Sequence, residues 1–231
     1  MKVWRLSDPV DSRFARASRR GSWSQSSGLC PECGASSQRR IQPLVLEWEP
    51  GSDAIGDFTW PGFGSDIAIT EPVANLLEAF GGFETGPVEM VQDSTLKRPS
   101  GSRSGKPRVW LPYEGPPLRD LWVTQQVHLD LERSSVRLVK ECMTCGRKHY
   151  DIDGIERYET GWDKERRESV ETRIPRQHGL GIYLAADALA GVAIFRLHEF
   201  PGWILVTDLV KNFVEKEGFT NVSFLEAGET L

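Results

Sequence analysis

The chain has 231 residues, of which 39% are hydrophobic and 10% aromatic, including eight tryptophans. Such a chain can bury a core, so its composition excludes global disorder. Its formal net charge of −5 at pH 7 argues against a general nucleic-acid binder, because phosphate contacts require clustered Lys and Arg.

Short alternating segments predict several strands along the chain. Residues 2–6, 44–48 and 123–131 alternate apolar and polar side chains. Residues 136–140 lead into the second of two cysteine pairs and residues 147–151 lead out of it, which is the arrangement of a zinc-ribbon hairpin.

Polar segments separate these predicted strands. Residues 18–28 and 94–106 are rich in Ser, Gly and charge, so we expect loops there, the second of them mobile. The charged run 163–176 fits either a short exposed helix or a loop.

Residues 71–80 predict the first helix. Thr70 is a suitable N-cap, and Glu71 favours the positive end of the helix dipole. Apolar side chains at i, i+3, i+4 and i+7 predict one buried stripe of Val73, Leu76, Leu77 and Phe80. The glycine pair that follows supplies the C-cap.

A second helix, residues 208–217, resembles the first, with Thr207 as its N-cap. Aligned on their threonines, the two segments share Thr, an acid, Val, Asn, two apolar positions, Glu and Gly, and each follows one CxxCG. The pattern predicts one domain over 1–231 with an internal duplication, about 28–92 and 136–226, whose second copy carries an insertion. The alternative is coincidence between two ordinary amphipathic helices.

Residues 41–96 form an acidic block with ten Asp and Glu and no Lys or Arg. Within it, a loop rich in Gly and Pro carries carboxylates among aromatic side chains, which suits a surface for a basic protein partner. The candidate partner-binding residues are Asp53, Asp57, Trp60 and Asp66. The alternative is that the aromatic residues fold this loop onto its own core.

All four cysteines of the chain lie in two CxxCG knuckles, Cys30–Cys33 and Cys142–Cys145. Two intervening residues let both sulfurs reach one metal, and the glycine lets backbone N–H groups turn toward them. Four thiolates would fill a closed structural zinc site, one ion per chain, that clamps distant parts of the chain together. A thioredoxin-like redox role and metal-free surface thiols are the alternatives.

The remaining residues give no catalytic signature. His149 follows Cys145 closely and could compete as a metal ligand, although we expect His149 to be a polar residue on a strand. The sequence contains no HExxH, P-loop, GxSxG or GxGxxG opening a helix, so we expect no enzyme. The absence of an apolar stretch near ~18 residues and of a signal-peptide core predicts a cytoplasmic protein.

The segments LCPECG, ECMTCG and IFRLHEFPGWILVTDLVKNFVEKEGFTNVSF resemble the paralogous double-CxxCG proteins of myxobacteria. The resemblance covers most of the chain, and only Cys30, Cys33, Cys142 and Cys145 carry over. It implies an immunity protein that protects its producer from a polymorphic toxin encoded nearby.

We therefore expect an α+β fold with mixed sheets, few helices and two related halves joined by a structural zinc site. The expected function is binding and blocking of a cognate antibacterial toxin, a nuclease, by steric and electrostatic occlusion. Two rivals remain, a zinc-ribbon nucleic-acid or transcription-associated module and an enzyme of unknown type. Binding to nucleic acid or to a membrane is not expected.

Overall fold

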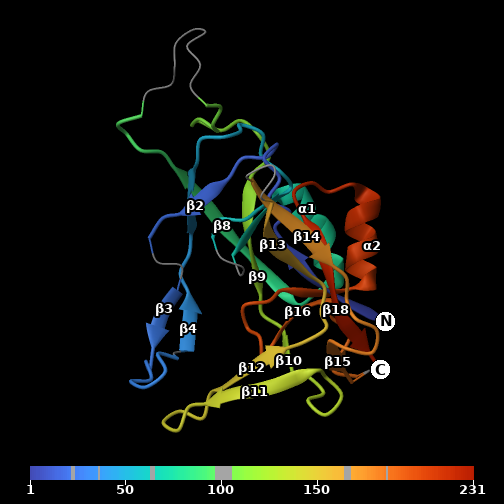
Figure 1. Ribbon diagram of the computed structural model, residues 1–231. Helices are drawn as coiled ribbons and strands as arrows, with labels where there is room; N and C mark the ends of the chain where they lie inside the picture. Colours follow the sequence, from blue (N-terminus) through green and yellow to red (C-terminus); the bar gives the residue numbers. More distant parts are fainter. Residues whose placement is uncertain (22–23, 36, 63–65, 97–105, 164–167, 186) are drawn as a thin grey trace.

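The computed structural model describes residues 1–21, 24–35, 37–62, 66–96, 106–163, 168–185 and 187–231. Within them the chain forms two mixed six-stranded sheets, three two-stranded hairpins and two short α-helices (Figure 1). This is the α+β architecture with mixed sheets and few helices that the sequence predicts. None of the described helices is long and apolar enough to cross a membrane.

The first sheet has the strand order β2-β5-β8-β9-β7-β6. Its strands are β2 (Ala17–Arg19), β5 (Leu44–Trp48), β6 (Phe58–Thr59), β7 (Ile67–Thr70), β8 (Phe83–Val91) and β9 (Leu118–Val123).

The second sheet has the order β10-β16-β17-β1-β18-β15. Its strands are β1 (Lys2–Ser7), β10 (Gln126–Val127), β15 (Ile182–Leu184), β16 (Ile194–Leu197), β17 (Leu205–Thr207) and β18 (Ser223–Thr230). The expected strand over 123–131 is wrong, since β9 ends at Val123 and only the two residues of β10 pair further along.

The two sheets share one plan over five strands. Strands β5, β8, β9, β7 and β6 have the same neighbours and relative directions as β15, β18, β1, β17 and β16. The first step is parallel and the other three are antiparallel in both sheets. The strand equivalent to β9 is β1, from the other end of the chain, and the N–H of Thr230 donates to the carbonyl of Met1. This arrangement supports the proposed duplication, which stays a prediction.

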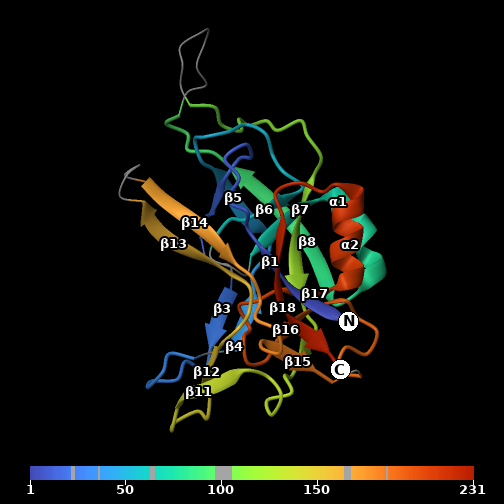
Figure 2. The same ribbon diagram turned by 45° about the vertical axis from the view of Figure 1, so that its right-hand side comes forward.

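Each sheet carries one helix between its equivalent strands. Helix α1 (Glu71–Leu77), extended by the 3₁₀ turn Glu78–Phe80, follows β7, and α2 (Asp208–Glu217) follows β17. The helices lie side by side (Figure 2), and the rings of Phe80 and Phe213 are 5.2 Å apart. Buried residues of both helices and both sheets form one shared core.

The helix boundaries agree with the sequence, but two details differ. Leu76 is 47% exposed, because Val73, Ala74 and Leu77 form the buried face of the short helix α1. Both threonines occupy the N-cap position, yet neither makes a side-chain capping hydrogen bond. Each ends a buried strand, and Pro72 also removes one N–H from the first turn of α1.

Three hairpins stand beside the two sheets. They are β3–β4 (Ser24–Ser27 and Ser37–Arg40), β11–β12 (Val136–Glu141 and Lys148–Ile152) and β13–β14 (Arg157–Asp163 and Glu168–Ile174). Strands β2, β3 and β14 lie where the sequence predicts loops or a short helix, so those three predictions are corrected. Most of the expected mobile loop, 94–106, lies outside the described residues.

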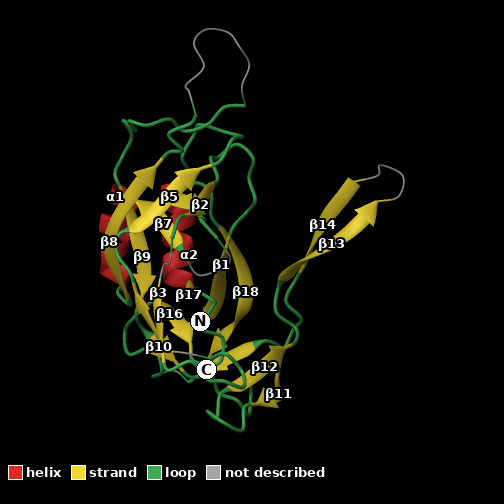
Figure 3. Cartoon of the chain, turned by 90° about the vertical axis from the view of Figure 1, so that its left-hand side faces the viewer, coloured by secondary structure: helices red, strands yellow, loops and turns green. Residues whose placement is uncertain are grey.

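The hairpin of β13 and β14, the β13–β14 arm, projects away from both sheets (Figure 3). It lies between β12 and β15, whereas only a few residues separate the first knuckle hairpin from β5. The arm is therefore the longer segment that distinguishes the second half from the first.

Candidate metal centre

Each CxxCG knuckle is the turn of one hairpin, and the two turns have the same backbone geometry. The N–H of Gly34 donates to the carbonyl of Cys30 at 2.9 Å, and that of Gly146 donates to the carbonyl of Cys142 at 2.8 Å. The two glycines have φ of 68° and 72°, a left-handed conformation that glycine adopts without strain. The two CxxCG sequences therefore form the same turn around their sulfur atoms.

The tips of the two hairpins meet, and all four sulfurs gather in one place. Their Sγ atoms lie within 4.8 Å of one another, with Cys30 and Cys142 separated by 3.7 Å and Cys33 and Cys145 by 3.5 Å. A tetrahedral ion with metal–sulfur bonds of ~2.3 Å needs sulfurs about 3.8 Å apart. The sulfur positions thus suit one four-coordinate metal ion.

The backbone of the first knuckle favours the thiolate form of Cys30, whereas in the second knuckle the backbone hydrogen bonds are outweighed by burial and neighbouring thiols, which raise the pKa of Cys142 and Cys145. Backbone N–H groups of Cys33 and Glu32 lower the pKa of the Cys30 thiol to about 7. These N–H groups point at the sulfur and would offset its negative charge after metal binding. The Glu32 carboxylate also reaches the second knuckle, where it accepts a hydrogen bond from the Thr144 hydroxyl at 2.7 Å.

Burial is uneven around the site. Cys30 and Cys142 are 6% and 0% exposed, whereas Cys33 is half-buried and Cys145 is exposed. One side of the cluster faces the protein and the other faces solvent. Four thiolates would occupy every position of a tetrahedral ion, which is the pattern of structural sites.

The alternatives drawn from the sequence fit less well. Both CxxC pairs lie in hairpin turns, and neither opens a helix as a thioredoxin-like pair does. In the part of the chain that the structure describes, the grouped ligand residues are the four cysteines alone. His149 lies on β12, as expected for a strand residue, and lines a separate cavity.

The four candidate partner-binding residues do not form one exposed surface. Asp53 is exposed, but Asp57 accepts hydrogen bonds from the N–H and hydroxyl of Thr220, both at 2.8 Å. Trp60 is half-buried against the shared core, and its indole N–H donates to the carbonyl of Asn221 at 2.8 Å.

Asp66 is the most enclosed of the four. It is 8% exposed and forms an ion pair with Arg19. This part of the loop is folded onto the protein, the alternative that the sequence left open.

Sequence reasoning missed two features of the second half. One is the β13–β14 arm, whose alternating Tyr158, Thr160 and Trp162 were a readable strand signal. The other is the cavity beside β12, whose histidines lie far apart in the sequence and carry no motif.

No family model matches the chain, and no curated protein matches it.

Proposed function

We propose that the four cysteines hold one structural zinc ion. Thiolate sulfur and tetrahedral geometry together favour zinc over magnesium, calcium or manganese, which prefer oxygen ligands. The ion would supply no reaction chemistry, since the four sulfurs leave no position for water or substrate. Its role would be to fix the two hairpin tips against each other.

On this framework we propose a cytoplasmic immunity protein, not an enzyme, that binds and blocks a cognate antibacterial toxin. One observation carries the proposal: the two CxxCG knuckles, on which the family resemblance rests, come together in a single site. A metal site without an open position shapes the protein but performs no catalysis, so its function would reside in the surfaces that it supports.

The β13–β14 arm is the surface that best suits a protein partner. Trp162 is 63% exposed, and Tyr158 and Val170 are each 38% exposed. Tryptophan and tyrosine are the residues that most often dominate binding energy at protein interfaces. The arm also stands clear of both sheets, so it could enter a toxin's cleft and occlude it.

Charge would assist binding if the toxin is a nuclease with a basic substrate cleft. The chain has a net charge of −5, and complementary charge raises association rates. Of the candidate residues Asp53, Asp57 and Asp66, Asp53 is the carboxylate that is exposed and so available for this role.

Co-expression with the adjacent toxin gene tests the proposal. Cells that make the toxin should survive when this protein is present and die when it is absent. Equal killing in both cases, with soluble protein confirmed, would remove the immunity function.

A zinc-ribbon nucleic-acid module is the second candidate, and one observation favours it. Arg147 and Lys148, which follow the second knuckle, line a cavity beside it. Retention of the protein on heparin or DNA at about 0.15 M salt, without toxin binding, would support this candidate.

A further inference from the structure

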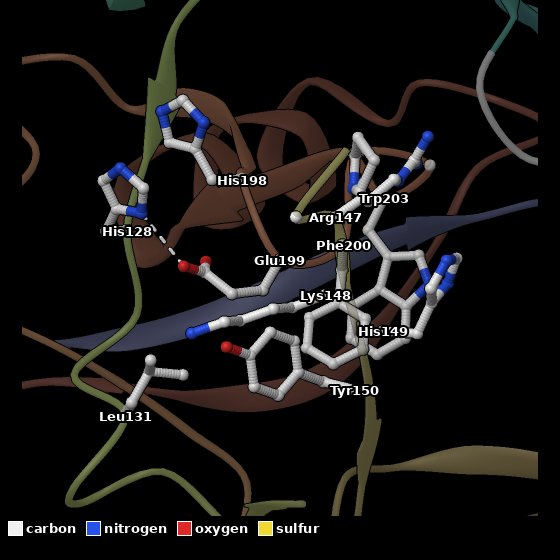
Figure 4. A pocket seen from close by; sticks show the side chains of 13 residues that line it. His128, Leu131, Arg147, Lys148, His149, Tyr150, His198, Glu199, Phe200 and Trp203 are labelled. Carbon is white, nitrogen blue, oxygen red and sulfur yellow. Dashed lines mark hydrogen bonds and ion pairs between the residues drawn. The ribbon is translucent and has the colours of Figure 1, made fainter. Parts of the chain in front are cut away.

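A cavity of about 580 Å³ opens beside the second knuckle (Figure 4). One wall is Arg147 with the beginning of β12, up to Tyr150, and the other is the segment from His198 to Trp203 that follows β16. Its volume falls within the range of about 300–1,000 Å³ that is usual for small-molecule sites.

The lining of the cavity carries more positive than negative charge. Neither Arg147 nor Lys148 has an ion-pair partner among the residues that the structure describes. Glu199 is the lining carboxylate, and its side chain is 8% exposed. Its oxygens are already engaged, one with Nδ1 of His128 at 2.9 Å and the other with the N–H of Leu129 at 3.2 Å. An anion would therefore meet the lysine and arginine without displacing an internal ion pair.

Two histidines provide a flat surface within the same cavity. The rings of His128 and His198 are stacked, with centroids 3.9 Å apart and planes inclined by 11°. The bond to Glu199 fixes the orientation of the His128 ring, and 70% of that side chain is exposed. A planar ring of a ligand could extend this stack, as nucleobases do on aromatic side chains.

The segment after β16 contributes an apolar pair to the cavity, and β12 contributes two polar side chains. Phe200 and Trp203 stack at 4.7 Å and pack against the core beneath the second sheet. The Lys148 amine and the Tyr150 hydroxyl point toward the same side of the cavity (Figure 4). These two groups are donors of the kind that phosphate oxygens accept.

We propose that this cavity binds a nucleoside phosphate. The base extends the His128–His198 stack, and the phosphate receives hydrogen bonds from Lys148 and Tyr150. The phosphate and base come either from a free nucleotide or from a single-stranded nucleic acid. The proposal goes beyond toxin binding and does not depend on it, because the β13–β14 arm lines no part of the cavity.

Calorimetry on the full, zinc-loaded chain tests the site with four probes: AMP, adenosine, inorganic phosphate and single-stranded oligoadenylate. We expect AMP or the oligonucleotide to bind saturably, at least about tenfold more tightly than adenosine or phosphate alone. Tighter binding of AMP identifies a free nucleotide as the source, and tighter binding of the oligonucleotide identifies nucleic acid. Binding should weaken as salt rises.

Two variants locate the binding in the cavity. Lys148→Ala and His128→Ala should each lower affinity at least about tenfold, because each removes one of the two interactions. Lys216→Ala, an exposed lysine on α2, removes the same charge elsewhere and should leave affinity unchanged. All three positions are exposed, and thermal unfolding and elemental analysis check that folding and zinc content match the parent protein, since His128→Ala also removes a hydrogen bond to Glu199. Absence of saturable binding by both AMP and the oligonucleotide, or equal affinity in Lys148→Ala and Lys216→Ala, overturns the proposal.

Discussion

The sulfurs of Cys30 and Cys142 lie 3.7 Å apart although 112 positions separate the two residues. A metal ion between them would close a loop that contains helix α1 and every strand of the first sheet except β2. Cross-linking so long a loop removes much of the conformational freedom of the unfolded chain. The ion should therefore stabilise the protein as a whole.

Loss of any one thiolate should destabilise the whole chain. Cys30→Ser and Cys142→Ser should each cost about 3 kcal/mol or more of the free energy of unfolding, because both remove a ligand of the same ion. Elemental analysis should find about one zinc per chain in the parent protein and much less in either variant. Met143→Ser is the control, since Met143 lies in a knuckle but is 89% exposed and should keep its metal. Reduced, freshly purified parent protein without metal would contradict the zinc assignment.

Thr207→Val should leave the protein equally stable or stabilise it by up to about 1 kcal/mol. The Thr207 hydroxyl is buried, the residue is 1% exposed, and it has no hydrogen-bond partner among the described residues. Valine has the same shape and removes that unsatisfied group. Denaturant unfolding measures the change, with Thr207→Ser as the control that keeps the hydroxyl and should be less stable. A loss of about 1 kcal/mol in the valine variant would instead indicate a working N-cap.

The sequence predicts local helices and turns more reliably than it predicts which strands pair in a sheet. Helix α2 begins and ends where its apolar positions and Gly218 place it, because capping and periodicity are local signals. The strands of a sheet pair across long separations, so no local signal shows that β1 would lie between β17 and β18. The cysteines are the exception, because one chemical requirement links Cys33 to Cys145 across the sequence.

The exposure of the candidate partner-binding residues, in contrast, could not be predicted from the sequence. Asp66 and Asp53 have the same residue type and the same acidic surroundings in the sequence, yet one is buried beside Arg19 and the other is exposed. Composition locates the acidic loop, and only the fold decides which carboxylates face solvent.

Glu156→Gln should loosen the attachment of the β13–β14 arm. Glu156 forms an ion pair with Arg173 and accepts a hydrogen bond from the N–H of Glu226 at 2.6 Å. These two contacts connect the arm to β18. An isolated hairpin has little stability of its own, so we expect faster hydrogen exchange along the arm and a loss of about 1–2 kcal/mol. Glu159→Gln is the control, because that exposed ion pair with Arg157 should contribute less than about 1 kcal/mol.

The stabilisation that the Glu156 carboxylate provides should decrease as the pH becomes acidic. Burial raises the pKa of this carboxyl, but hydrogen bonds from Arg173 and from the Glu226 backbone outweigh burial and hold the pKa below 4.5. Because the pKa of Glu156 is lower in the folded protein than in the unfolded chain, its carboxylate stabilises the folded protein at pH values above the unfolded-state pKa. This contribution disappears as the pH falls through the folded-state pKa. The difference between parent and Glu156→Gln should therefore be full near pH 7 and shrink below about pH 4. A difference that grows in acid would contradict this assignment.

Charge reversal in the acidic loop is informative at one position only. Asp53→Lys should slow association with the toxin and leave stability unchanged, because Asp53 is exposed. Asp66→Lys should unfold the protein, since it would bury a second cation beside Arg19. Stopped-flow association at low and high salt measures the first effect, and thermal unfolding measures the second. Equal association rates for Asp53→Lys and the parent would remove this loop from the interface.

Trp162→Ala should weaken binding to the adjacent-gene toxin by at least about 30-fold without changing the melting temperature. Trp162 is 63% exposed on a two-stranded hairpin, so its removal leaves no buried cavity. In a complex the same indole would be desolvated, and truncating a desolvated tryptophan typically costs 2 kcal/mol or more. Leu209→Ala is the matched control, because Leu209 is equally exposed, at 63%, but lies on α2. If both variants bind as the parent does while co-expression still protects cells, the toxin is bound elsewhere. If protection itself fails, the immunity proposal is lost.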